Sequence, residues 1–107
     1  MTDCSLVIDR LRLRLSAAAR WRRDLAKKFP DDPRNNRASQ RLFELAASTA
    51  FERVDEPAVE ILLPHIESPA FAAAASSAAR DIGFRKTVPD INGFVALVHE
   101  HLAEGAH

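Results

Sequence analysis

The sequence has little of what disulfide-bonded, metal-binding and nucleotide-binding proteins usually contain. Its 107 residues include one cysteine, three glycines and no tyrosine. A single cysteine excludes a disulfide or a cysteine-based metal site within one chain. The three glycines form no glycine-rich phosphate-binding motif. We therefore expect no cofactor and no metal ion.

Long hydrophobic runs are missing as well. The longest stretch without a charged residue, 68–79, has twelve residues, and a membrane-spanning helix needs about 20. The apolar cluster at 6–8 is interrupted at once by Asp9 and Arg10, so we expect no signal peptide. Together with the lone Cys4, these features predict a cytoplasmic protein that does not enter a membrane.

The residues that are abundant favour helices. Alanine occurs nineteen times, and 47% of the residues are hydrophobic and 28% charged, which is typical of a globular protein. Alanine, leucine, arginine and glutamate lose little side-chain freedom in a helix. We predict an all-α fold: one domain, residues 1–107, forming a compact bundle of four to five helices. Two long N-terminal helices should make an antiparallel hairpin, followed by shorter C-terminal helices.

Prolines, glycines and capping residues set the predicted helix boundaries. Pro30 should end the first helix, Ser68 should cap the fourth, Gly83 should stop it, and a capping box at 87–90 should open the last. The predicted helices are 5–28, 36–54, 55–63, 69–83 and a final helix that ends near 104.

Helical periodicity predicts which side chains are buried. The first helix should bury Cys4, Ile8, Leu11, Leu15, Ala18, Leu25 and Phe29. The second should bury Ala38, Leu42, Leu45, Ala46 and Thr49. The last two should bury Phe71, Ala75, Ala78, Ala79, Ile82, Ile91, Phe94, Val95, Val98 and Leu102.

The charges are divided unequally along the chain. Residues 1–54 carry twelve Lys/Arg and seven Asp/Glu (12 − 7 = +5), whereas residues 55–107 carry three and eight (3 − 8 = −5). On the first helix, four residues fall along one flank and form the candidate partner-binding residues: Arg10, Arg14, Trp21 and Lys28. This flank either meets a partner or is a solvated face neutralised by the acidic second half.

Two functions are the main candidates for this pattern, and a third, a small-molecule-binding or enzymatic bundle, would need a polar pocket around Arg22 or His65. We favour a protein–protein interaction or regulatory module, which includes the possibility of a homodimer. The alternative is a nucleic-acid-binding protein whose basic first helix contacts phosphates. A second candidate contact surface is a face of small residues, Ala72, Ala73, Ser76 and Ser77, which is either exposed or covered by another helix.

Arg22 falls within the apolar stripe of the first helix, where a nonpolar residue is expected. A guanidinium removed from water needs a partner. We predict a buried ion pair with a carboxylate of the second half, and the candidates are Glu60, Glu67, Asp81 and Glu100. The alternative is that the helix kinks or the stripe drifts, so that Arg22 reaches water.

Other motifs argue against enzymatic or sequence-specific DNA-binding activity. Residues 78–84 resemble the first helix and turn of a helix-turn-helix, but Pro89 and Gly93 fall where its recognition helix would be. His99 and His101 lie about 200° apart on a helix, unlike zinc-binding pairs. No nucleophile motif is present. We expect no catalytic residues.

Overall fold

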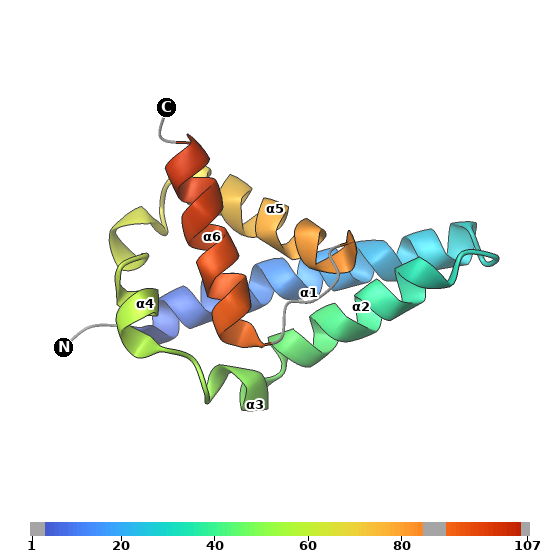
Figure 1. Cartoon of the computed structure of the whole chain (residues 1–107), viewed down its shortest axis with the longest axis horizontal. Coiled ribbons are helices and arrows are strands. Elements are labelled where there is room, and N and C mark those ends of the chain that lie inside the picture. Colours follow the sequence, from blue (N-terminus) through green and yellow to red (C-terminus); the bar gives the residue numbers. More distant parts are fainter. Residues whose placement is uncertain (1–3, 85–89, 106–107) are drawn as a thin grey trace.

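The computed structural model describes residues 4–84 and 90–105, and these residues form helices joined by turns. Figure 1 shows the order α1 (Cys4–Lys28), α2 (Pro33–Ala46), α3 (Ser48–Phe51), α4 (Glu56–Glu60), a 3-10 turn η1 (Leu63–His65), α5 (Pro69–Phe84) and α6 (Ile91–Gly105). No strand occurs among the described residues. The all-α prediction is confirmed.

The long helices α1 and α2 lie antiparallel and extend beyond the other helices at their connected end (Figure 1). Small buried residues line this contact. They are Ala19 and Ala26 on α1, and Ala38 and Ser39 on α2. The Ser39 hydroxyl donates a 2.9 Å hydrogen bond to the Ala19 carbonyl oxygen. The predicted hairpin is therefore present, and it is close because its facing side chains are short.

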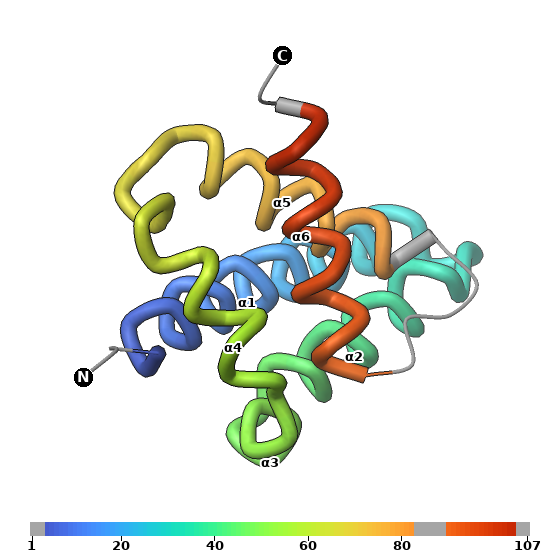
Figure 2. The backbone as a smooth tube through the Cα atoms, turned by 60° about the vertical axis from the view of Figure 1, so that its left-hand side comes forward, coloured from blue at the N-terminus to red at the C-terminus, as the bar shows by residue number. Residues whose placement is uncertain are grey.

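The remaining helices cover one side of this hairpin. α5 contacts both α1 and α2, and α6 crosses α5. Figure 2 shows α4 between the start of α1 and helix α6. It contacts both helices. The principal extents are 47 × 33 × 22 Å. No helix of residues 4–84 and 90–105 combines the length and the apolar character that a bilayer crossing requires.

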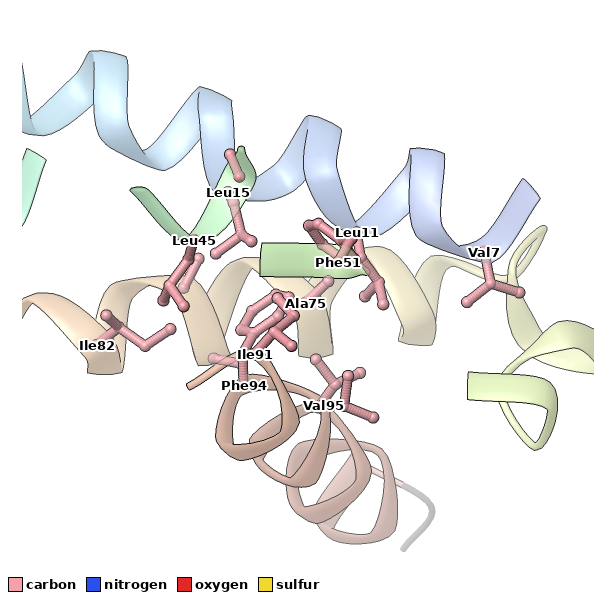
Figure 3. Packing of buried hydrophobic residues seen from close by; sticks show 14 of the residues in the cluster. Val7, Leu11, Leu15, Leu45, Phe51, Ala75, Ile82, Ile91, Phe94 and Val95 are labelled. Carbon is pink, nitrogen blue, oxygen red and sulfur yellow. The ribbon is translucent and has the colours of Figure 1, made fainter. Parts of the chain in front are cut away.

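The core lies where five helices meet. Figure 3 shows Leu11 and Leu15 of α1, Leu45 of α2, Phe51 of α3, Ala75 and Ile82 of α5, and Ile91, Phe94 and Val95 of α6. All of these side chains are buried. The predictions for α5 and α6 are confirmed, except that Leu102 is only half-buried.

The starts of three helices follow from local capping. Asp32 caps α2, since its side chain accepts a hydrogen bond from the Arg34 amide (3.0 Å) and Pro33 occupies the first turn. Because of this cap, α2 begins three residues before the predicted start. Ser68 caps α5 as predicted, accepting from the Phe71 amide at 3.1 Å. Asp90 caps α6 by accepting from the Gly93 amide at 3.0 Å.

Two further predictions concern the segment between α5 and α6. α5 includes Gly83 and ends at Phe84, so Gly83 does not stop the helix as predicted. Thr87 of the predicted capping box lies outside the described residues.

The prediction of one helix over 36–54 is wrong. Ala47 adopts an extended backbone (φ −63°, ψ 145°) and separates α2 from α3. In a continuous helix, Phe51 would lie about 180° from the buried stripe of α2. The break turns Phe51 into the core instead, where it is buried, while Thr49, predicted to be buried, is exposed.

The buried stripe of α1 is also rotated from the predicted one. Cys4, Ile8, Ala18 and Leu25 are half-buried and Phe29 is exposed, whereas the buried residues are Val7, Leu11, Leu15, Ala19, Arg22 and Ala26. The shift follows from the two neighbours of α1. α2 and α5 contact adjacent sides of this helix, and the stripe between them is centred on Leu15 and Ala19.

Candidate functional site

The side of α1 opposite the core carries large apolar residues that remain exposed among residues 4–84 and 90–105. At 100° per residue, Leu6, Arg10, Leu13, Ala17 and Trp21 fall within an arc of about 80°, and we call this stripe the outer face of α1. Leu13 is 54% exposed and Trp21 is 48% exposed. Single exposed apolar residues are ordinary, but several aligned on one helix face indicate a contact surface.

Basic side chains flank the outer face. Arg20, Lys27 and Lys28 are exposed, Arg14 is half-buried, and the acidic residues nearby on the helix are Asp9 and Asp24. Arg10 forms an ion pair with Glu67 at 3.6 Å, and both side chains are largely exposed. Of the predicted partner-binding residues, Arg10, Trp21 and Lys28 are thus exposed, Arg14 is partly covered, and Arg10 already has an acidic neighbour.

Sequence reasoning found Trp21 and its basic neighbours but missed the leucines beside them. Leu6 and Leu13 are seven residues apart, so they lie on one side of the helix, roughly opposite the buried stripe. That spacing was the available signal. It was obscured because the alternation of Leu and Arg at 11–15 places leucines on both sides of α1.

Arg22 is 3% exposed, as its place in the apolar stripe predicted. Its Nη1 donates a 3.3 Å hydrogen bond to the side-chain oxygen of Asn35, on α2. Its guanidinium also lies over the Trp21 ring, 4.7 Å from the centroid. Burial, and next the positive charge of Arg80, lower the pKa of Arg22. Arg22 therefore connects the core to the indole at the edge of the outer face.

Three of the predicted carboxylate partners of Arg22 either contact another residue or are exposed. Glu67 pairs with Arg10, Asp81 contacts His101, and Glu100 is exposed on α6. The described hydrogen bond of Arg22 joins it to a neutral amide of the first half. The buried ion pair with Glu60 or another of these carboxylates stays a prediction.

The structure brings together an acidic and imidazole cluster that the sequence did not indicate. His101 Nε2 lies 2.8 Å from Asp81 Oδ2, and its Nδ1 lies 3.5 Å from Glu104 Oε2. Asp81 is on α5, twenty residues away, so only the crossing of α5 and α6 reveals the contact. Within residues 4–84 and 90–105, no group of three or more metal-binding side chains is arranged around a common point. The cluster joins α5 to α6.

The other histidines and the small-residue face lie elsewhere. His99 Nε2 contacts the Ala58 carbonyl oxygen at 2.9 Å, which ties α6 to α4, and His65 is exposed. On the small-residue face, Ala73 is exposed and Ala72, Ser76 and Ser77 are half-buried. This face is less open than the outer face of α1.

Comparison with protein-family models, with curated proteins and with solved structures gives no match to this chain.

Proposed function

We propose that the chain is a protein-association module that binds a partner protein through the outer face of α1. The observation that supports this is the exposure of Leu13 and Trp21 in one stripe opposite the core. Tryptophan, tyrosine and arginine are the residues that most often contribute binding energy at protein interfaces, and this stripe holds Trp21 and Arg10. From Leu6 to Trp21 the stripe is about 22 Å long, which accommodates four turns of a partner helix.

The charges of this surface select the partner. An acidic amphipathic helix would place apolar side chains against Leu13 and Trp21 and carboxylates against the flanking Arg and Lys side chains. Two copies of the outer face would bring together two surfaces of net positive charge, since the basic residues of each copy (Arg10, Arg14, Arg20, Lys27 and Lys28) outnumber Asp9 and Asp24. We therefore propose an acidic partner rather than a dimer formed by α1 against α1.

Nucleic-acid binding is the alternative use of the same surface. Arg20, Lys27 and Lys28 are exposed and suit phosphate groups. Leu6 and Leu13, however, offer nothing to a phosphate backbone, and Leu13 lies in the middle of the stripe. The exposed leucines are the reason to favour a protein partner.

Photocrosslinking tests the proposal. A photoreactive amino acid at position 17, in the outer face, is compared with the same amino acid at position 103, an exposed alanine of α6. In lysate of the source cells, position 17 should give a discrete, protease-sensitive adduct that position 103 does not give. A nuclease-sensitive adduct would support the alternative, and the absence of any adduct specific to position 17 would refute both.

A matched pair of variants adds a test of the face itself. Leu13→Glu removes an apolar contact and introduces a charge that repels an acidic partner, so the yield of adduct should fall at least about tenfold. Ile61→Glu makes the same change at another exposed residue, which is 62% exposed and lies after α4. This control should keep the adduct. Equal loss in both variants would contradict the assignment to the outer face.

A further inference from the structure

A hollow of about 520 Å³ lies where α2 ends, α3 turns away and α6 begins. Figures 1 and 2 show these three elements meeting on the side of the molecule where the α2–α3 bend lies. Pockets that bind small molecules commonly have volumes of about 300–1,000 Å³. The lining residues are Arg41, Glu44, Leu45, Thr49, Ala50, Arg53, Asp90 and Ile91.

The break at Ala47 creates this hollow. If α2 continued straight, α3 would not turn toward the start of α6. Asn92 then fixes the wall beyond α3, because its Nδ2 donates to the Arg53 carbonyl oxygen at 3.2 Å and its Oδ1 accepts from the Asp55 amide at 2.8 Å. The backbone that carries Arg53 is therefore held against the first turn of α6.

The floor and the rim of the hollow differ in chemistry. Leu45 and Ile91 are buried and Ala50 is half-buried, and these three residues give an apolar floor. The rim carries both signs of charge, and its Arg53 and Glu44 are exposed. Among the described residues, no salt bridge joins Arg53 to Glu44 or to Asp90.

Two rim residues are anchored by hydrogen bonds to the fold. Arg41 Nη1 donates to the Ile82 carbonyl oxygen at 3.3 Å, near the end of α5. Asp90 Oδ1 accepts from the Gly93 amide at 3.0 Å, which leaves its second oxygen able to accept from a ligand. Fixed charges of this kind bind a ligand without a large cost in ordering side chains.

We propose that this hollow binds a small zwitterion, namely a free amino acid or a molecule with the same adjacent ammonium and carboxylate groups. The carboxylate would pair with the Arg53 guanidinium and the Thr49 hydroxyl, and the ammonium with Glu44 and Asp90. Either charge alone is disfavoured, since a plain anion meets two carboxylates and a plain cation meets two guanidinium groups. The ligand side chain lies on the apolar floor.

Nuclear magnetic resonance titration tests the site with defined probes. Leucine, serine, glutamate and arginine are each added to the full chain, up to about 50 mM, which covers millimolar affinities. At least one should shift the amide signals of Thr49, Ala50 and Ile91 in a saturable way. The C-terminal amide and the deaminated acid of that amino acid each lack one charge, and each should bind at least about tenfold more weakly.

Variants separate the site from non-specific binding. Arg53→Gln should weaken the binding at least about tenfold. Arg37→Gln, a change of an exposed arginine of α2 that does not line the hollow, should leave it unchanged. Saturable binding that survives Arg53→Gln, equal binding of the singly charged analogues, or no saturable shift with any amino acid would each overturn the proposal. Circular dichroism of both variants verifies that they are folded.

Discussion

Arg22 is a charged residue held between the two helices of the hairpin. Its neighbours are the Asn35 side chain and the Trp21 ring, and Arg80 repels it electrostatically. A guanidinium removed from water is stable only while its polar neighbours satisfy it. The Asn35 oxygen therefore contributes more to stability than an exposed asparagine does.

Replacing Asn35 measures this contribution. Asn35→Ala removes the acceptor and should lower the free energy of unfolding by about 1–2 kcal/mol. This value is at the lower end of the range for hydrogen bonds to charged groups, because the distance between Arg22 and Asn35 is long. Urea unfolding followed by circular dichroism gives the value. Asn36→Ala, at the exposed neighbouring position, should change it by less than about 0.5 kcal/mol. If both variants lose the same amount, the buried hydrogen bond is not the cause.

The burial of Arg22 was predictable from helical spacing, but its neighbour was not. A position three residues after Ala19 and four before Ala26 belongs to the buried stripe whatever residue occupies it. Asn35 reaches it only because the turn at 29–32 folds α2 back along α1. The register of two helices depends on how their side chains interlock, and no local pattern encodes that register.

At the scale of single helices, the start of α2 depends on one carboxylate. Asp32 accepts hydrogen bonds from the Arg34 amide and from its guanidinium, at 3.0 Å and 2.8 Å for the closest contacts. The hydrogen bonds to the Arg34 side chain, and next to its backbone, lower the pKa of Asp32 from 3.8 to about 2. The ionised form of Asp32 thus favours the folded state.

This pKa shift predicts how stability depends on pH. A carboxylate whose pKa is lower in the folded state contributes stability above its ordinary pKa, and the contribution disappears as the pH falls through the folded-state value. The window for Asp32 is therefore from about pH 4 down to about pH 2. Asp32→Asn keeps a capping oxygen but has no charge, so wild type should exceed it in stability above this window and converge with it below.

Urea unfolding at several pH values between about 6 and about 2 tests this convergence. Asp31→Asn is the control, because Asp31 is exposed beside Asp32 and does not cap the helix. The control should follow the wild-type curve. A constant difference between wild type and Asp32→Asn across the window would contradict the linkage.

The helix ends show what local sequence determines. The N-cap of α5 was predicted correctly because a hydroxyl followed by proline satisfies the first amides of a helix directly. The break at Ala47 has no such signal, since neither proline nor glycine occurs near it. It arises from the burial of Phe51, against whose ring the Arg12 guanidinium lies at 5.1 Å. Tertiary burial overrides helix propensity there.

For the whole molecule, few of the described ion pairs join the two oppositely charged halves of the chain. One described ion pair, Arg10–Glu67, joins them, and it is exposed at 3.6 Å. The other described pairs lie within one half, as in Arg12–Asp9 and His101–Asp81. Exposed pairs contribute little, and one apolar core contains buried residues of both halves, such as Leu15 and Phe94. We therefore expect apolar burial to hold the halves together.

Salt dependence measures this balance. Raising sodium chloride from about 50 mM to about 500 mM screens exposed charges and should change the free energy of unfolding by less than about 1 kcal/mol. Chemical denaturation with urea, which is uncharged, is suited to the measurement. A steep loss of stability with salt would mean that attraction between the halves holds the fold.

Trp21 has one more consequence, for spectroscopy. It is the single tryptophan of a chain without tyrosine. Fluorescence excited at about 295 nm therefore comes from one indole at the surface of α1. Trp21 is already 48% exposed in the folded state. Unfolding will therefore shift its emission only slightly, while a molecule that covers α1 will shift it to the blue. In this protein, intrinsic fluorescence reports occupancy of the surface and is nearly blind to melting of the core.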